Sequence, residues 1–178
     1  MNVRYEFRAA LRRAARSFLG TKETARNSGP EIDAWLEYVH AKPGDPWCPA
    51  FVSFMHRCAA VLLDVPNTCP RTDSVHRMWE LTPPQCRVAI PYPGCTYFIE
   101  HSPTSGHTGI VDIVSPGGTV MSEISGNTNG AGSREGNQVA EHHGPPELSH
   151  GGKLLGFADY AELIAPGLGE LPPSPFAA

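Results

Sequence analysis

Apolar residues recur at helical spacing near the start of the chain. We predict a helix over residues 3–19, because one side of it carries Val3, Phe7, Leu11, Ala14 and Phe18. The opposite side carries Arg4, Arg8, Arg12 and Arg16. Such a basic amphipathic helix is typical either of a segment that touches an anionic surface or of an ordinary packed helix with a solvated face. We favour the packed helix, because the segment is short and the whole chain is acidic.

Three more helices are expected before residue 82. One spans about 30–40, with Pro30 near its start. The next runs from about Pro49 to Leu63, and its inward side is predicted to hold Phe51, Val52, Met55, Ala59 and Leu62. A short helix covers 73–81, where Thr72 or Asp73 can cap the free backbone N–H groups.

From Pro91 onward the apolar pattern changes from helical spacing to alternation. The segments CTYFIE, HTGIVDIV, GTVMSEIS, NQVAEHH and KLLGFADY read as strands separated by glycine-rich turns. Helices followed by antiparallel strands predict an α+β fold, in which N-terminal helices pack on an antiparallel sheet. We expect a single domain over residues 1–165 and a flexible Pro/Gly-rich tail over 166–178.

Composition narrows the classes of function. The chain has 178 residues, of which 14 are basic and 18 are acidic, and its net charge is −4. Proteins that bind nucleic acids usually have a basic domain, so we expect no nucleic-acid binding. No apolar run is long enough for membrane insertion, and the N-terminus lacks the apolar core of a secretory signal. We therefore expect synthesis in the cytoplasm.

The cysteines point to free thiols. The five cysteines are Cys48, Cys58, Cys69, Cys86 and Cys95, an odd number that excludes complete pairing. No C-x-x-C pair is present, so we predict no thiolate zinc site. The last four lie in a helix interior, in irregular segments or at a strand start, and we interpret them as structural.

Cys48 is the candidate nucleophile. Pro49 follows it, and proline is favoured at the first helical position, which predicts that Cys48 is the N-cap. Free backbone N–H groups and the positive end of the helix dipole would then face the sulfur and lower the pKa of the thiol. The alternative is a small buried apolar residue that happens to precede a helix.

A thiolate needs a base, and His107 is the candidate. It follows Gly106 and begins an apolar strand, so its ring can point from a sheet edge into a cleft. The alternative is a surface histidine at a turn. His56 lies eight residues beyond Cys48, too far along the same helix. His142 and His143 hint at a metal site, but we find no third ligand at sensible spacing and expect none.

A third group would orient the imidazole. Asn127, in the segment EISGNTNG, is the candidate acceptor for the ring N–H, although an asparagine there also suits a turn. Glu123 is a second candidate, because on a strand it would share a face with Ser125 and Asn127.

Taken in order, the motifs PWCPAFVSFM, PYPGCTYFIE, GHTGIVDIV, SEISGNTN and GSREGNQV resemble a known family. The resemblance is to CHAP domains, the cysteine/histidine-dependent amidohydrolases and peptidases related to NlpC/P60 and papain, and especially to phage-type peptidoglycan hydrolases. It spans roughly residues 20–160. It implies a papain-like fold and hydrolysis of an amide bond in bacterial cell walls, either N-acetylmuramoyl–L-alanine or a bond of the peptide stem.

The resemblance also assigns roles to residues. It implies Cys48 as nucleophile, His107 as base and Asn127 as the third member. We also expect Trp47, Gly106 and Ser125 to take part in substrate binding, with simple core packing as an equal alternative for Trp47. Ser125 stands where the family often has glutamate, so orientation of the imidazole passes to Asn127 or to Glu123. Calcium-binding members carry an Asp-rich loop before the cysteine. This chain has only Asp45 there, so we expect no metal and no cofactor.

Two alternatives use the same fold. One is a non-catalytic module that binds cell walls or confers immunity, and the other is an acyltransferase or an enzyme that cleaves proteins. With peptidoglycan as the expected partner, the protein would act on the cell wall after release through a holin-type pore or after injection with a secretion or immunity partner. The sequence does not decide between an endolysin and an injected effector.

Overall fold

Five helices and six strands make up the part of the chain that the computed structural model describes, residues 2–116, 121–129 and 136–165. The helices are α1 (Val3–Ser17), α2 (Pro30–Tyr38), α3 (Cys48–Leu63), α4 (Val75–Leu81) and α5 (Pro146–His150). The strands are β1 (Arg87–Val88), β2 (Thr96–Ser102), β3 (Ser105–Val114), β4 (Met121–Thr128), β5 (Gln138–His143) and β6 (Lys153–Ala158). Two 3₁₀ turns, η1 (Pro84–Cys86) and η2 (Tyr160–Leu163), complete the set. The expected tail at 166–178 lies outside the described residues.

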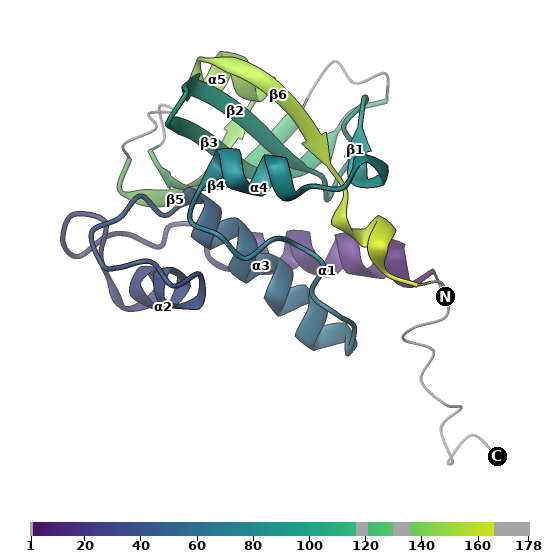
Figure 1. Cartoon of the computed structure of the whole chain (residues 1–178), viewed down its shortest axis with the longest axis horizontal. Coiled ribbons are helices and arrows are strands. Elements are labelled where there is room, and N and C mark those ends of the chain that lie inside the picture. The colour runs from purple at the N-terminus through teal and green to yellow at the C-terminus, as the bar shows by residue number, and fades with distance from the viewer. Residues whose placement is uncertain (1, 117–120, 130–135, 166–178) are drawn as a thin grey trace.

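The strands form one antiparallel sheet with the order β1-β6-β2-β3-β4-β5. The last strand, β6, returns to pair with β2 and so lies inside the sheet. Figure 1 shows α1, α2 and α3 below the sheet, with α5 and β6 at its upper edge. The predicted α+β class, with N-terminal helices packed on an antiparallel sheet, is therefore confirmed.

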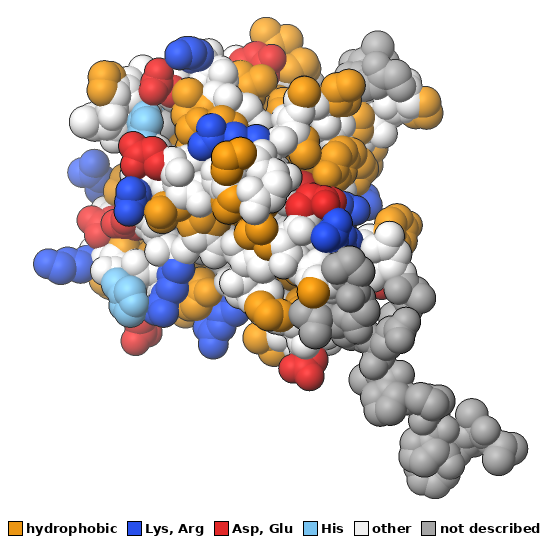
Figure 2. Space-filling view, turned by 45° about the vertical axis from the view of Figure 1, so that its right-hand side comes forward, with side chains coloured by type: hydrophobic (Ala, Val, Ile, Leu, Met, Phe, Trp, Pro, Cys, Tyr) orange, Lys and Arg blue, Asp and Glu red, His pale blue; other side chains and the backbone are white. Residues whose placement is uncertain are grey.

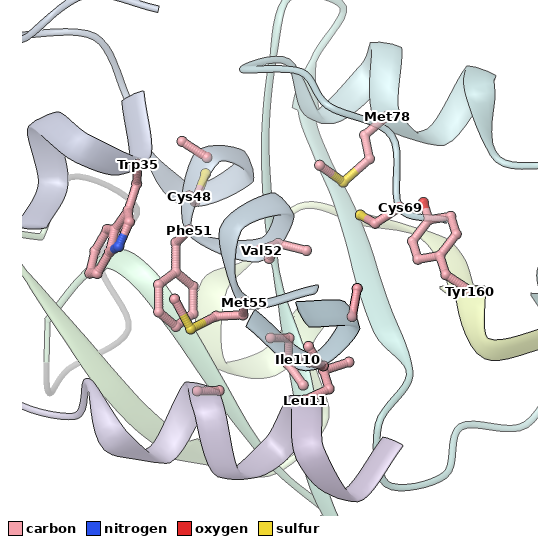
Figure 3. Packing of buried hydrophobic residues seen from close by; sticks show 14 of the residues in the cluster. Leu11, Trp35, Cys48, Phe51, Val52, Met55, Cys69, Met78, Ile110 and Tyr160 are labelled. Atoms are coloured by element: carbon pink, nitrogen blue, oxygen red, sulfur yellow. The ribbon is translucent and has the colours of Figure 1, made fainter. Parts of the chain in front are cut away.

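The larger core lies between the helices and the sheet. Phe51, Val52 and Met55 of α3 are fully buried there, as predicted, and Figure 3 shows them with their neighbours from α1, α2 and β3. The prediction for Leu62 is wrong, because its side chain is 66% exposed. In Figure 1 the last turn of α3 extends away from the sheet, so no strand lies there to cover it.

The start of α3 approaches β4 very closely at Gly126. A Cβ added to this glycine would lie 2.8 Å from an atom of the Trp47 ring and 2.9 Å from Cβ of Phe51. Real Cβ atoms do not come this close to other heavy atoms, so only glycine fits. This contact fixes where the first turn of α3 meets the sheet.

The arginine side of α1 is turned toward acidic groups of the same chain. Arg12 and Arg16 both pair with Asp112 of β3, whose side chain is fully buried. Nearer the N-terminus of the helix, Arg8 pairs with the buried Asp159. Arg4 pairs with Glu162 in the same C-terminal turn. The helix is therefore packed, as expected, but the expectation of a solvated arginine face is wrong, because these charges tie α1 to β3 and to η2.

Smaller features depart from the sequence predictions. The hydroxyl of Ser74, rather than Thr72 or Asp73, caps α4 by accepting from the N–H of Arg77. The short elements β1 and α5 were not predicted, because two to five residues carry too little periodicity.

In the space-filling view of Figure 2, basic and acidic side chains are interspersed across the visible face. Among the described residues, no helix is long and apolar enough to cross a membrane.

We predict that Asp112→Asn lowers the free energy of unfolding by about 1–3 kcal/mol, because two guanidinium groups lose their shared buried carboxylate. Chemical denaturation followed by circular dichroism measures the change. Asp64→Asn, at an exposed position after α3, is the matched control and should stay within about 0.5 kcal/mol of the unmodified protein. Equal stabilities for the two variants would contradict an anchoring role for Asp112.

Candidate active site

A cleft of roughly 470 Å³ opens at the first turn of α3. Its lining includes three residues that the sequence analysis selected, Cys48, Gly106 and Asn127. They come from α3, β3 and β4, so the fold brings together segments up to 79 positions apart. Charged side chains at the rim include Glu23, Arg26 and Asp73. The cleft is therefore a polar site with a thiol among its lining groups.

Cys48 is the first residue of α3, and Trp47 is the N-cap. The helix thus begins one residue earlier than predicted. The Cys48 side chain is only 3% exposed, and the backbone N–H groups of Thr108 and of Cys48 itself face the sulfur. These N–H groups favour the thiolate, but burial outweighs them and raises the pKa of the Cys48 thiol to about 12. The expected lowering of the pKa is therefore wrong for this structure, in which the thiol is protonated.

His107 is fully buried in β3, directly before Thr108. It lies opposite Ile99 of β2, on the sheet face that belongs to the smaller core cluster with Tyr97 and Ile99. In the part of the chain that the structure describes, neither ring nitrogen of His107 has a hydrogen-bond partner. Burial, followed by the nearby His150, holds the pKa of His107 well below its usual value, so the imidazole is neutral. A neutral imidazole can accept a proton, but His107 is not among the residues that line the cleft with Cys48.

Asn127 reaches the cleft through an irregularity of the strand. The pairing of β4 with β5 shifts between Ser125 and Thr128, and Asn127 has a left-handed backbone with φ of 57°. The simple alternation that would have put Asn127 on one face with Glu123 is therefore broken. The side-chain oxygen of Asn127 is buried without a hydrogen bond. Neither Asn127 nor Glu123 is hydrogen-bonded to His107, so the orienting role stays a prediction.

The three residues expected to bind substrate have different surroundings. Gly106 lines the cleft, and a Cβ there would meet the carbonyl oxygen of Ile99 and the side chain of Val75. Trp47 does not wall the cleft, because it is fully buried and its Nε1–H donates to Glu23 over 2.9 Å. Ser125 is also fully buried and is not among the cleft-lining residues. Of the three, only Gly106 can contact a ligand in this cleft.

Behind His107 lies a buried polar network that the sequence did not indicate. The Tyr97 hydroxyl donates to Glu123 Oε2 over 2.9 Å, and His150 Nε2 lies 2.6 Å from Glu123 Oε1. The ring of His150 also lies beside that of His107, with 4.2 Å between the centroids. Ser125 is close enough to the Tyr97 hydroxyl to lower its pKa, although burial raises that pKa overall. The network therefore surrounds the side of His107 that faces away from α3.

His142 belongs to the same network, and His143 does not. One ligand atom each from Glu123, His142 and His150 lie within 4.8 Å of one another, and all three residues are buried. His143 is exposed. The conclusion that His142 lacks further ligands is therefore wrong. These residues are 19 and 8 positions apart in the chain, a spacing that matches no short metal motif, so only the pairing of β4 with β5 and the position of α5 reveal them.

Comparison with known proteins identifies no relative of this chain. No family model matches the chain, and no curated protein and no solved structure is significantly similar to it. The geometry of the cleft and the motifs of the sequence are therefore the basis for a functional proposal.

We predict that Cys48 reacts slowly with iodoacetamide at pH 7 and about tenfold faster with each added pH unit up to pH 9. The reason is that only the thiolate reacts, and a raised pKa makes its population grow with pH throughout this range. Peptide mapping by mass spectrometry measures each cysteine separately. Cys58, half-buried on the same helix, is the internal reference. A labelling rate of Cys48 that is already constant between pH 5 and 7 would instead reveal a thiolate–imidazolium pair.

Proposed function

We propose that the protein is a cysteine hydrolase that cleaves an amide bond of bacterial peptidoglycan, with a papain-like arrangement of nucleophile and base. One observation carries the proposal. Cys48 lines the cleft at the first residue of α3, with the Thr108 N–H at its sulfur and His107 next to Thr108 in β3. A thiol at a helix start is suited to nucleophilic attack on a carbonyl carbon once a base takes its proton. His107 does not line the cleft, so the proposal requires its ring to turn toward the sulfur.

The protonation states favour proton transfer during attack. With the pKa of Cys48 raised and that of His107 lowered, the resting pair is a thiol and a neutral imidazole. In the proposed reaction the ring of His107, which lies on the opposite face of β3 in this structure, turns toward the cleft. The sulfur of Cys48 then attacks the amide carbonyl while His107 takes the thiol proton. His107 then passes this proton to the leaving amine, the C–N bond breaks and a thioester remains. Water, deprotonated by His107, attacks the thioester carbon, which releases the carboxylic acid and restores the thiol.

Backbone groups at the sulfur support the same chemistry. The N–H groups of Cys48 and Thr108 point at the reacting atom. Once the sulfur has bonded to carbon, these donors are available to the negative oxygen of the tetrahedral intermediate. We assign them to oxyanion stabilisation.

The charges around the cleft suit the proposed substrate. Arg26 on one side can pair with a carboxylate, and Glu23 or Asp73 can pair with an amine. Peptide stems of peptidoglycan carry free groups of both kinds, whereas the glycan strands are largely uncharged. The mixed charge therefore favours a substrate site that holds the peptide stem, and it does not decide between the amidase and the endopeptidase reaction.

Asn127 is our proposed third member of the site. Within the described residues, its side-chain oxygen is buried at the cleft without a donor and can accept from an imidazole N–H. Both oxygens of Glu123, by contrast, are engaged by Tyr97 and His150. We therefore assign Glu123 to the network behind His107 and Asn127 to the cleft.

A non-catalytic module that binds cell walls is the second candidate. Two observations favour it, the protonated thiol of Cys48 and the absence of a hydrogen bond on His107. Both functions use the same cleft, but only a hydrolase releases new termini from its substrate.

We predict that the purified protein releases peptide-containing fragments from purified peptidoglycan, and that Cys48→Ala lowers the rate at least about 10³-fold. Chromatography with mass spectrometry of the soluble fragments measures the rate and identifies the new amine and carboxyl groups, hence the bond that is cut. The matched control is Cys58→Ala on the same helix, outside the cleft, which should keep the full rate.

Three results would contradict this assignment. Release by Cys48→Ala at the normal rate excludes a thioester mechanism. Binding of peptidoglycan without release by the unmodified protein selects the non-catalytic module. Fragments with transferred acyl groups, or cleavage of proteins alone, select the acyltransferase or the protein-cleaving enzyme.

A further inference from the structure

The buried network behind His107 contains three side chains that can ligate a metal ion. Glu123 comes from β4, His142 from β5 and His150 from the end of α5, and their nearest ligand atoms all lie within 4.8 Å of one another. All three residues are buried. Glu123 and His150 are paired with each other, and together with His142 they gather one carboxylate and two imidazoles, a donor set that can hold a metal ion. We propose that Glu123, His142 and His150 bind one zinc ion.

The donor set selects the chemical class of the ion. Two imidazoles and one carboxylate are typical of zinc and related transition metals, whereas calcium and magnesium require mainly oxygen ligands. Zinc holds such atoms at about 2.0–2.2 Å, which places the ligands of a tetrahedral site about 3.3 Å apart. His150 and Glu123 are already 2.6 Å apart. Binding therefore requires the pair to separate slightly and His142 to move inward, which side-chain rotation can supply.

A second observation comes from His107. Its ring lies beside that of His150, is fully buried, and has no hydrogen bond to either nitrogen. Buried polar groups are normally satisfied by protein or by water. Three protein ligands leave a fourth position on zinc, which a water molecule usually fills. Such a water would give His107 a partner inside the network.

The hydrogen bonds around the ligands suit a metal site. The Tyr97 hydroxyl donates to the second oxygen of Glu123. His142 Nε2 lies 3.2 Å from the Thr128 hydroxyl, and His142 keeps this bond if it ligates through Nδ1. Partners of this kind orient ligating groups and raise metal affinity. The proposal concerns metal binding alone, so it does not depend on hydrolysis of peptidoglycan.

The test uses the full chain after removal of metal with a chelator and exchange into chelator-free buffer. Titration with zinc chloride, followed by calorimetry, should give one ion per chain. At a zinc concentration 100-fold above the dissociation constant, the melting temperature should rise by roughly 5–10 °C. Calcium and magnesium chloride at the same concentration should leave the melting temperature unchanged.

Variants locate the ion. Glu123→Gln and His142→Gln should each weaken zinc binding at least about 100-fold. The matched control is His143→Ala, the exposed neighbour of His142, which should bind as the unmodified protein does. Cys48→Ala should also bind normally, which separates this site from coordination by the thiol in the cleft.

Cobalt provides a measurement that needs no variant. Co²⁺ bound to the unmodified protein should show visible absorption bands and no thiolate charge-transfer band, because the ligands are nitrogen and oxygen. A charge-transfer band would place the ion on a cysteine and overturn the proposal. So would failure to bind one zinc ion per chain, or binding that is unchanged in Glu123→Gln and in His142→Gln.

Discussion

The close approach of α3 to β4 is the contact on which the candidate site depends. Gly126 has no side chain, so the rings of Trp47 and Phe51 can pack directly against the strand. The first turn of α3 is thereby held against the sheet, and Cys48 meets the backbone of β3 at Thr108. A larger residue at Gly126 would push α3 away and separate the thiol from that backbone.

The sheet separates two polar regions that meet at neighbouring residues of β3. The thiol and the cleft lie at the start of α3, where Thr108 contacts the sulfur. The hydrogen-bonded network of Tyr97, Glu123 and His150 lies at His107. Because successive residues of a strand point to opposite faces, His107 and the Thr108 backbone that contacts the thiol belong to opposite sides of the sheet.

The sequence predicted the regular elements well where apolar spacing was strong. The helix at α1 and the strands β2, β3, β5 and β6 fall within a few residues of the predicted ranges. The sequence predicted the burial of single side chains less well, because burial depends on which other elements pack against them. Leu62 fits the apolar side of α3 but is exposed, because that side extends beyond the sheet. Trp47 was assigned to the cleft, yet the contact with Gly126 draws it into the core.

By itself, the sequence determined the fold class and singled out Cys48 and His107, because periodicity and a proline after a cysteine are local features. The tertiary structure decided the pKa of Cys48, since burial depends on everything packed around the thiol. It also decided that the α1 arginines face acids of the same chain. The grouping of Glu123 with His142 and His150 required strand pairing and the position of α5. Distances between residues far apart in the chain are set by packing, and no local pattern encodes them.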